Sequence, residues 1–134
     1  MLDGTMELNS LERMVMEMLL TGDEPALQIL ADQFRTATVS SREMTGVGFY
    51  TTFMVAPQEP RLNGAKSLQL SDVSADIEGL EHGAGFVLFV KDGMINFLEG
   101  YSFDESWPAH TDNFRLSYIG RPTRDLASLR QDLG

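Results

Sequence analysis

The hydrophobic residues in the first quarter of the chain recur every three or four positions, which is the spacing of one face of a helix. Residues 8–19 and residues 27–34 each carry such a stripe, and a short polar stretch separates them. Asn9 and Glu12 match a capping box at the start of the first stripe, and Asp23 is placed to cap the second. The pattern predicts two short amphipathic helices joined by a tight turn.

From residue 46 the hydrophobic period changes to two, the period of a strand with one buried face. The segments with strand character follow one another as residues 47–55, 70–80, 86–90, 94–98 and 114–118. The third and fourth segments flank Asp92-Gly93, a dipeptide that readily takes the positive-φ positions of a type I′ hairpin turn. Both faces of this hairpin are largely apolar, so we expect it to lie in the middle of a sheet rather than at its rim.

Helices followed by a run of strands, without regular alternation, are typical of α+β proteins with an antiparallel sheet. We therefore predict a single α+β domain over residues 1–134. Its two N-terminal helices pack on an antiparallel sheet of four to five strands. A short C-terminal helix carries the apolar residues Leu126, Leu129 and Leu133.

The hairpin also leads to a prediction for Glu99. With a two-residue turn and a regular ladder, Phe86 faces Glu99, which puts this carboxylate on an otherwise apolar face. A carboxylate on such a face needs a partner or marks the point where the face opens to solvent. A structural ion pair with Arg42 or Arg115 is one interpretation, and an acid that faces a ligand is the other.

The charge of the chain is the most unusual feature of its composition. There are 20 Asp and Glu against 10 Lys and Arg, a net charge of −10, whereas the 43% hydrophobic content is ordinary for a folded protein. So acidic a surface repels phosphate backbones, which disfavours nucleic acid as a partner and favours a basic protein or a cationic ligand. No secretory signal and no apolar run long enough to span a membrane is visible, so we expect a cytoplasmic protein that does not bind membranes.

Little in the chain points to a specific chemistry. The absence of cysteine excludes thiolate metal sites and thiol nucleophiles, no motif is specific to a reaction, and we expect no cofactor. Asp76 and Glu78 lie about 7 Å apart on one strand face; they are weak candidates for a metal site, and a solvated strand face is the simpler interpretation. His82 lies among glycines, where it could approach a ligand closely or have a structural role. Trp107, the only tryptophan, could anchor an interface or fold back as a lid over the end of the sheet.

Two segments of the chain, residues 42–51 and 85–108, resemble small bacterial single-domain proteins, a group that includes immunity-type modules. Within the second segment the resemblance rests on two short motifs, Leu98-Glu99-Gly100-Tyr101 and Glu105-Ser106-Trp107-Pro108. The resemblance implies a compact bacterial domain without a familiar active site, and it implies no catalytic residues.

These observations lead to two hypotheses about function. The first is a small acidic bacterial module that binds a basic protein partner without catalysis, as an immunity-type protein would. The second is a small-molecule-binding protein or an enzyme with a pocket near Glu99 and His82. The candidate binding residues for either are Glu99, His82, Trp107, Tyr101 and Arg42. A homodimer is compatible with both hypotheses.

Overall fold

The computed structural model describes residues 7–119, which form two helices followed by seven strands. The helices are α1 (Ser10–Leu19) and α2 (Pro25–Thr36). The strands are β1 (Thr38–Met44), β2 (Gly48–Met54), β3 (Leu68–Leu70), β4 (Val73–Ile77), β5 (Ala84–Lys91), β6 (Met94–Ser102) and β7 (Phe114–Tyr118). A short 3-10 turn, η1 (Asn63–Ala65), precedes β3. No helix within residues 7–119 is long and apolar enough to cross a membrane.

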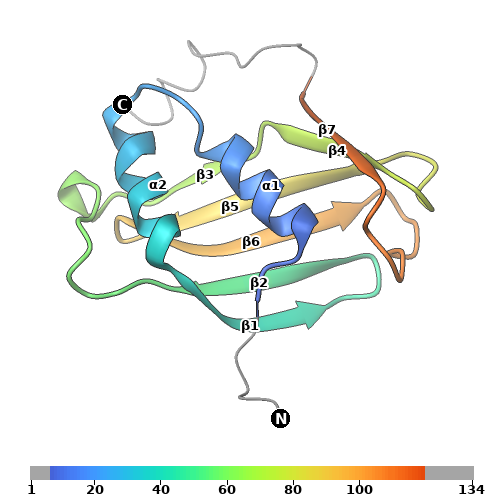
Figure 1. Cartoon of the computed structure of the whole chain (residues 1–134), viewed down its shortest axis with the longest axis horizontal. Helices are drawn as coiled ribbons and strands as arrows, with labels where there is room; N and C mark the ends of the chain where they lie inside the picture. Colours follow the sequence, from blue (N-terminus) through green and yellow to red (C-terminus); the bar gives the residue numbers. More distant parts are fainter. Residues whose placement is uncertain (1–6, 120–134) are drawn as a thin grey trace.

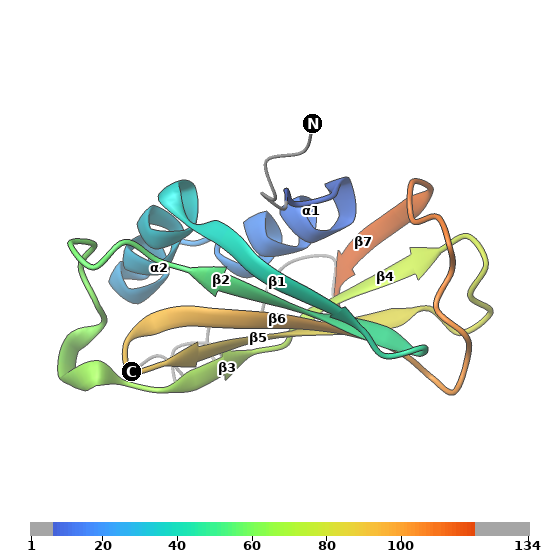
Figure 2. The same ribbon diagram turned by 90° about the horizontal axis from the view of Figure 1, so that it is seen from below.

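All the strand pairs are antiparallel and belong to one sheet (Figure 1). Its order is β1-β2-β6-β5-β4-β7, and β3 pairs with the part of β5 that β4 leaves free. Both helices lie on the same side of the sheet, as the view from below shows (Figure 2). We call the side of the sheet turned away from the helices the outer face; no described helix or strand covers it.

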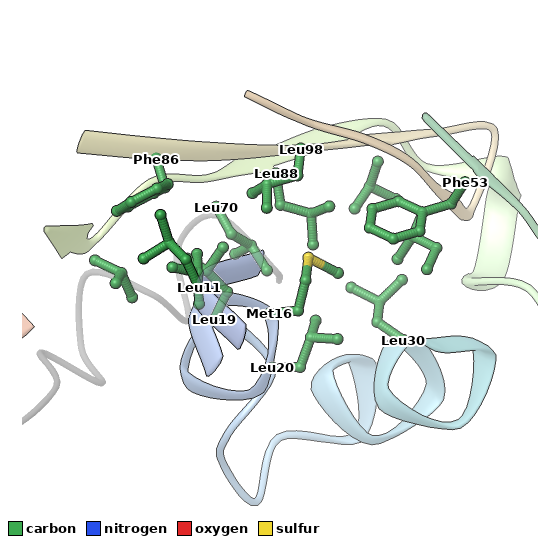
Figure 3. Close-up of a cluster of buried hydrophobic side chains, with 14 of the residues drawn as sticks. Leu11, Met16, Leu19, Leu20, Leu30, Phe53, Leu70, Phe86, Leu88 and Leu98 are labelled. Carbon is green, nitrogen blue, oxygen red and sulfur yellow. The ribbon is translucent and has the colours of Figure 1, made fainter. Parts of the chain in front are cut away.

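The hydrophobic core lies between the helices and the inner face of the sheet, where side chains from both layers point toward one another (Figure 3). Burying a large apolar side chain there contributes about 1.5–3 kcal/mol. The largest buried apolar residues of the helices are Leu11, Met16, Leu19, Leu27 and Leu30, and those of the sheet include Phe49, Phe53, Leu70, Phe86, Leu88 and Leu98.

The start of α1 has the predicted capping box. The Asn9 side chain accepts from the Glu12 backbone N–H, and the Glu12 side chain accepts from the Asn9 backbone N–H. The cap predicted for α2 is wrong by one position, because the N-cap residue is Glu24 and not Asp23. Glu24 makes no side-chain capping bond, and Pro25 instead starts the helix with its fixed φ.

The predicted fold is wrong in its strand count. The α+β class, the two N-terminal helices and the antiparallel sheet are present, but the sheet has seven strands and not four to five. The strands that the sequence did not indicate are β1, a polar edge strand, and β3, which is only three residues long. The described chain has no helix after β7; the segment with Leu126, Leu129 and Leu133, where we expected one, lies outside the described residues.

A buried ion pair joins α1 to the edge of the sheet. The Glu12 carboxylate is fully buried and receives two hydrogen bonds from the Arg42 guanidinium, at 2.8 Å and 2.5 Å. The buried Thr51 hydroxyl also donates to Glu12. Arg42 additionally donates to the backbone carbonyl of Glu7 at 2.9 Å. Arg42 is thus a structural residue of β1, and it is not the partner of Glu99 that the sequence led us to consider.

A second buried polar residue, Gln33 of α2, holds the turn between β5 and β6. Its side-chain nitrogen donates to the carbonyls of Pro60, at 2.8 Å, and Gly93, at 3.0 Å. Its side-chain oxygen accepts from the Ile95 backbone N–H at 2.9 Å. The turn itself has positive φ at both Asp92, 54°, and Gly93, 81°, as the type I′ prediction requires.

Candidate functional site

A β-bulge in β6 decides which of its side chains face outward. Val90 lies opposite Ile95, but the next residue of β5, Phe89, lies opposite Phe97. Asn96 is therefore an extra residue without a direct partner on β5. Because side chains alternate along a strand, one inserted residue reverses the face of everything that follows it.

The predicted position of Glu99 is wrong for this reason. Glu99 lies opposite Val87 and not opposite Phe86, so it is on the outer face and half-buried. The inward-facing positions around it are Leu98 and Gly100, both buried. The carboxylate that we expected on the core side of the hairpin is thus on the uncovered side of the sheet.

The bulge also aligns outward-facing side chains into rows that run across the strands. A middle row crosses β1, β2, β6 and β5, and one row flanks it on each side. The middle row is Glu43–Tyr50–Glu99–Val87. The flanking rows are Thr52–Phe97–Phe89–Gln69 and Gly48–Tyr101–Gly85–Ser74.

Three aromatic rings from three strands are in contact on the outer face. The Phe89 and Phe97 rings are stacked, with centroids 4.3 Å apart and an interplanar angle of 19°. The Tyr50 ring meets Phe97 edge-on at 5.7 Å. We call Tyr50, Phe89 and Phe97 the outer aromatic cluster. Aromatic rings grouped on an uncovered surface are typical of binding sites rather than of ordinary solvated surface.

Tyr101 extends this aromatic surface toward the end of β6. A Cβ atom at Gly85 would lie 2.4 Å from the Tyr101 hydroxyl oxygen, so the ring lies directly against the β5 backbone and only glycine leaves room for it. Phe103, just beyond the strand and 52% exposed, packs edge-on against Tyr101 at 5.6 Å. Tyr101, a predicted binding residue, thus lies on the same face as Glu99.

The outer face is negative at its centre. The charge of the nearby Glu99 carboxylate, with smaller effects of burial and of Glu43, raises the pKa of the Tyr50 phenol above its usual 10.0. The salt bridges that involve only residues 7–119 are Arg35–Asp32 and Arg42–Glu12. Neither Glu99 nor Glu43 therefore has a cationic partner among those residues.

A shallow hollow of about 310 Å³ lies beside the stacked rings. It is lined by Ser67, Leu68, Gln69, Phe89, Val90, Lys91, Asn96 and Phe97. Apart from Lys91 at the end of β5, these residues are neutral, so the hollow is suited to an uncharged part of a ligand.

His82 lies away from this surface, in the loop between β4 and β5. The backbone N–H groups of Glu81 and His82 donate to the Glu105 carboxylate at 2.8 Å and 2.9 Å. These bonds, with a further contribution from the nearby His82 side chain, lower the pKa of Glu105. Ala84, two residues after His82, pairs with Ser102, about 10 Å along β6 from Glu99. Neither His82 nor Glu99 lines the hollow beside the stacked rings, and a pocket that contains both stays a prediction.

Trp107 packs over the end of the sheet. Its ring meets Phe49 edge-on at 5.5 Å, and its backbone N–H donates to the Gly46 carbonyl at 2.9 Å. The side chain is half-buried. This is the contact that a lid makes, and its role as an interface anchor stays a prediction.

The remaining candidates, Asp76 and Glu78, are exposed toward the β4–β7 edge of the sheet. Asp76 lies opposite Arg115 across the β4–β7 pair, and Glu78 follows the end of β4. No group of three or more His, Asp or Glu residues that could hold a metal ion occurs within residues 7–119.

A larger groove, of about 630 Å³, runs between the helices and the start of β1. Its lining mixes acidic and basic side chains with apolar ones: Glu7, Leu8, Arg13, Glu17, Ala31, Phe34, Arg35, Ala37, Thr38 and Val39. Because Arg35 already pairs with Asp32 at 2.6 Å, this groove selects no single class of charged ligand.

Sequence reasoning missed Tyr50, Phe89 and Phe97 as candidates. The signal in the sequence is that both faces of the 86–98 hairpin are apolar. This pattern indicates a central position in the sheet, and it also reflects an aromatic surface on the outer side. Comparison of the chain with protein-family models gave no match, and no match was found among curated proteins or among solved structures.

Proposed function

We propose that the chain is a protein-binding module without catalytic activity, and that the outer face of the sheet docks a basic partner protein. An immunity-type module that neutralises a basic effector is the specific form of this proposal. The observation that carries it is the outer aromatic cluster, which no described element covers. The carboxylates of Glu43 and Glu99 lie beside this cluster and form no salt bridge within residues 7–119.

The aromatic rings supply the affinity in this proposal. Tyr50 is 36% exposed, and Phe89 and Phe97 are half-buried, so a partner can remove further apolar surface from water. Large rings lose little conformational freedom on binding, which is why tyrosine and tryptophan dominate the energetics of many interfaces. A sheet face also holds its side chains in fixed positions, so a partner meets a preformed surface.

The charge supplies the choice of partner. With a net charge of −10, the chain attracts basic proteins and repels nucleic acids over several ångströms of solution. On the outer face itself, Glu43 and Glu99 lie on the row that contains Tyr50. The long-range field and the local charge therefore favour the same class of partner.

A comparison of two surface variants tests the proposal. Tagged wild type, Phe97→Ser and Met14→Ser are used to capture partners from cells that express the protein naturally, after circular dichroism has shown that all three are folded. Met14 lies on α1, is 47% exposed and is the matched control. We expect a basic protein to be captured by wild type and Met14→Ser and to be lost with Phe97→Ser.

The captured protein is then purified, and its association rate is measured at low and at physiological salt. Electrostatic steering predicts that the rate falls steeply as salt rises. A partner that Phe97→Ser still binds with wild-type affinity, or an association rate that does not depend on salt, would contradict the proposal.

A further inference from the structure

We propose that the outer face binds an arginine side chain of its partner, with the guanidinium on the Glu99 carboxylate and its plane against the outer aromatic cluster. This inference rests on the proposed function and names the chemical group that the docking surface recognises. It follows from three features of the surface: the unpaired carboxylates, the stacked rings and the hollow beside them.

In this inference the Glu99 carboxylate binds the cation, and Glu43 adds negative charge nearby. Glu43 on β1 and Glu99 on β6 lie on either side of Tyr50 in the same cross-strand row, and because β2 separates their strands, the two positions are about 10 Å apart. Glu99 is half-buried, and a half-buried carboxylate interacts with a cation more strongly than one fully in water. Neither carboxylate takes part in a salt bridge with another residue of the 7–119 region, so no cationic side chain of that region competes with a cation from outside.

The stacked rings favour arginine over lysine. Phe97 lies two positions from Glu99 on the same face of β6, about 7 Å away. A guanidinium is planar, stacks on aromatic faces and binds a carboxylate with two parallel hydrogen bonds. An ammonium has no plane to stack and is more strongly hydrated. The pairing of a carboxylate with aromatic rings at this spacing therefore suits a guanidinium.

The hollow sets the direction of the bound side chain. Its lining is neutral near Phe89 and Phe97 and positive at Lys91. Lys91 repels a guanidinium, whereas Glu99 attracts one. The guanidinium therefore lies toward Glu99, and the aliphatic stem of the arginine or a neutral neighbouring residue occupies the hollow.

The same charges disfavour other occupants of this face. A second copy of the chain would bring Glu43 and Glu99 against like charges of its own kind, and a nucleic acid would bring phosphates against them. Self-association through this face, or binding of an oligonucleotide to it, would overturn the inference.

Binding of short peptides tests the inference directly. The probes are a glycine-serine peptide whose only charged side chains are two arginines, and the same peptide with lysine or with citrulline in their place. Binding is followed by backbone amide chemical shifts and by the absorbance titration of tyrosine. We expect the arginine peptide to bind about five- to tenfold more tightly than the lysine peptide, to shift the amides of β2 and β6, and to lower the pKa of Tyr50. Citrulline, which keeps the shape without the charge, should not bind.

Three variants separate the local site from the general field. Glu99→Gln keeps the shape of the side chain and should weaken the arginine peptide about tenfold, and Phe97→Leu should remove the preference for arginine over lysine. Asp76→Asn removes one charge from an acid that already faces Arg115 and should leave binding unchanged. Equal affinities of the arginine and lysine peptides, or equal losses with Glu99→Gln and Asp76→Asn, would overturn the inference. The proposed function would survive that result if the natural partner were still lost with Phe97→Ser, so the two failures are distinguishable.

Discussion

Replacing Gln33 by methionine measures what α2 contributes to the β5–β6 hairpin. Methionine keeps the length and volume of the side chain and removes both of its polar ends. Three hydrogen bonds are lost, two to carbonyls and one from a backbone N–H. The Gly93 carbonyl keeps a second bond, from the Leu62 N–H at 3.0 Å. The groups left without a partner are therefore the Pro60 carbonyl and the Ile95 N–H.

The magnitude follows from those two groups. A buried donor or acceptor without a partner costs about 1–3 kcal/mol. The Pro60 bond is partly buried and the Ile95 bond is buried, so the sum should be about 2–4 kcal/mol. We expect Gln33→Met to lower the free energy of unfolding in urea by that amount and to weaken the protection of the Ile95 amide against hydrogen exchange.

Gln28→Met is the matched control, because Gln28 belongs to the same helix and is exposed. That substitution should change stability by no more than about 0.5 kcal/mol. If Gln33→Met and Gln28→Met had the same stability, the hydrogen bonds of Gln33 would not hold the turn and the reasoning would be refuted.

Three further predictions concern the rest of the fold. Arg42→Met leaves the Glu12 carboxylate buried without its cation, so it should lower the free energy of unfolding in urea by about 3–5 kcal/mol. Adding Glu12→Gln should restore part of this loss. Wild-type stability of Arg42→Met alone would contradict the prediction. A Cβ at Gly100 would lie 2.3 Å from the Phe49 ring in the core, so Gly100→Ala should cost about 1–3 kcal/mol, and an unchanged thermal midpoint would disprove the close contact. The pKa of Glu105 is lowered by two backbone hydrogen bonds, so its ionised form stabilises the folded state above the ordinary value of 4.5, and this contribution is lost as the pH falls through the lowered folded-state pKa. Glu105→Gln should therefore reduce the loss of unfolding free energy as the pH falls below 4.5. An unchanged dependence of stability on pH would contradict this prediction.

The sequence predicts well those features that depend on neighbouring residues. The capping box of α1 and the turn at Asp92-Gly93 are each formed within a few residues, and both are present. The β-bulge at Asn96 could not be predicted in this way. Both faces of the hairpin are apolar, so the hydrophobic pattern fits a regular ladder and a ladder shifted by one residue equally well. That shift alone was enough to place Glu99 on the wrong face.

The edge strand β1 was missed for a different reason. Its sequence, residues 38–44, is polar and follows no alternation, because its pairing with β2 is itself irregular between Val39 and Ser41. An edge strand of this kind is stabilised by its pairing with β2 and by the buried contact of Arg42 with Glu12. Both are tertiary interactions, which local sequence patterns do not show. The candidate site could not be predicted from the sequence for the same reason. Its rings come from three strands, and their contacts depend on the register of those strands.

The β-bulge in β6 also bears on the kinetics of folding. The turn at Asp92-Gly93 can close before the bulge forms, and the hairpin can then pair either straight or shifted at Asn96. In the straight register Glu99 would point into the forming core beside Phe86, where an unpaired carboxylate costs several kcal/mol. Its charge therefore disfavours the wrong pairing, and Glu99→Leu removes that penalty. Refolding of Glu99→Leu should accordingly show a second, slower phase in which hairpins paired in the straight register must open before they can fold.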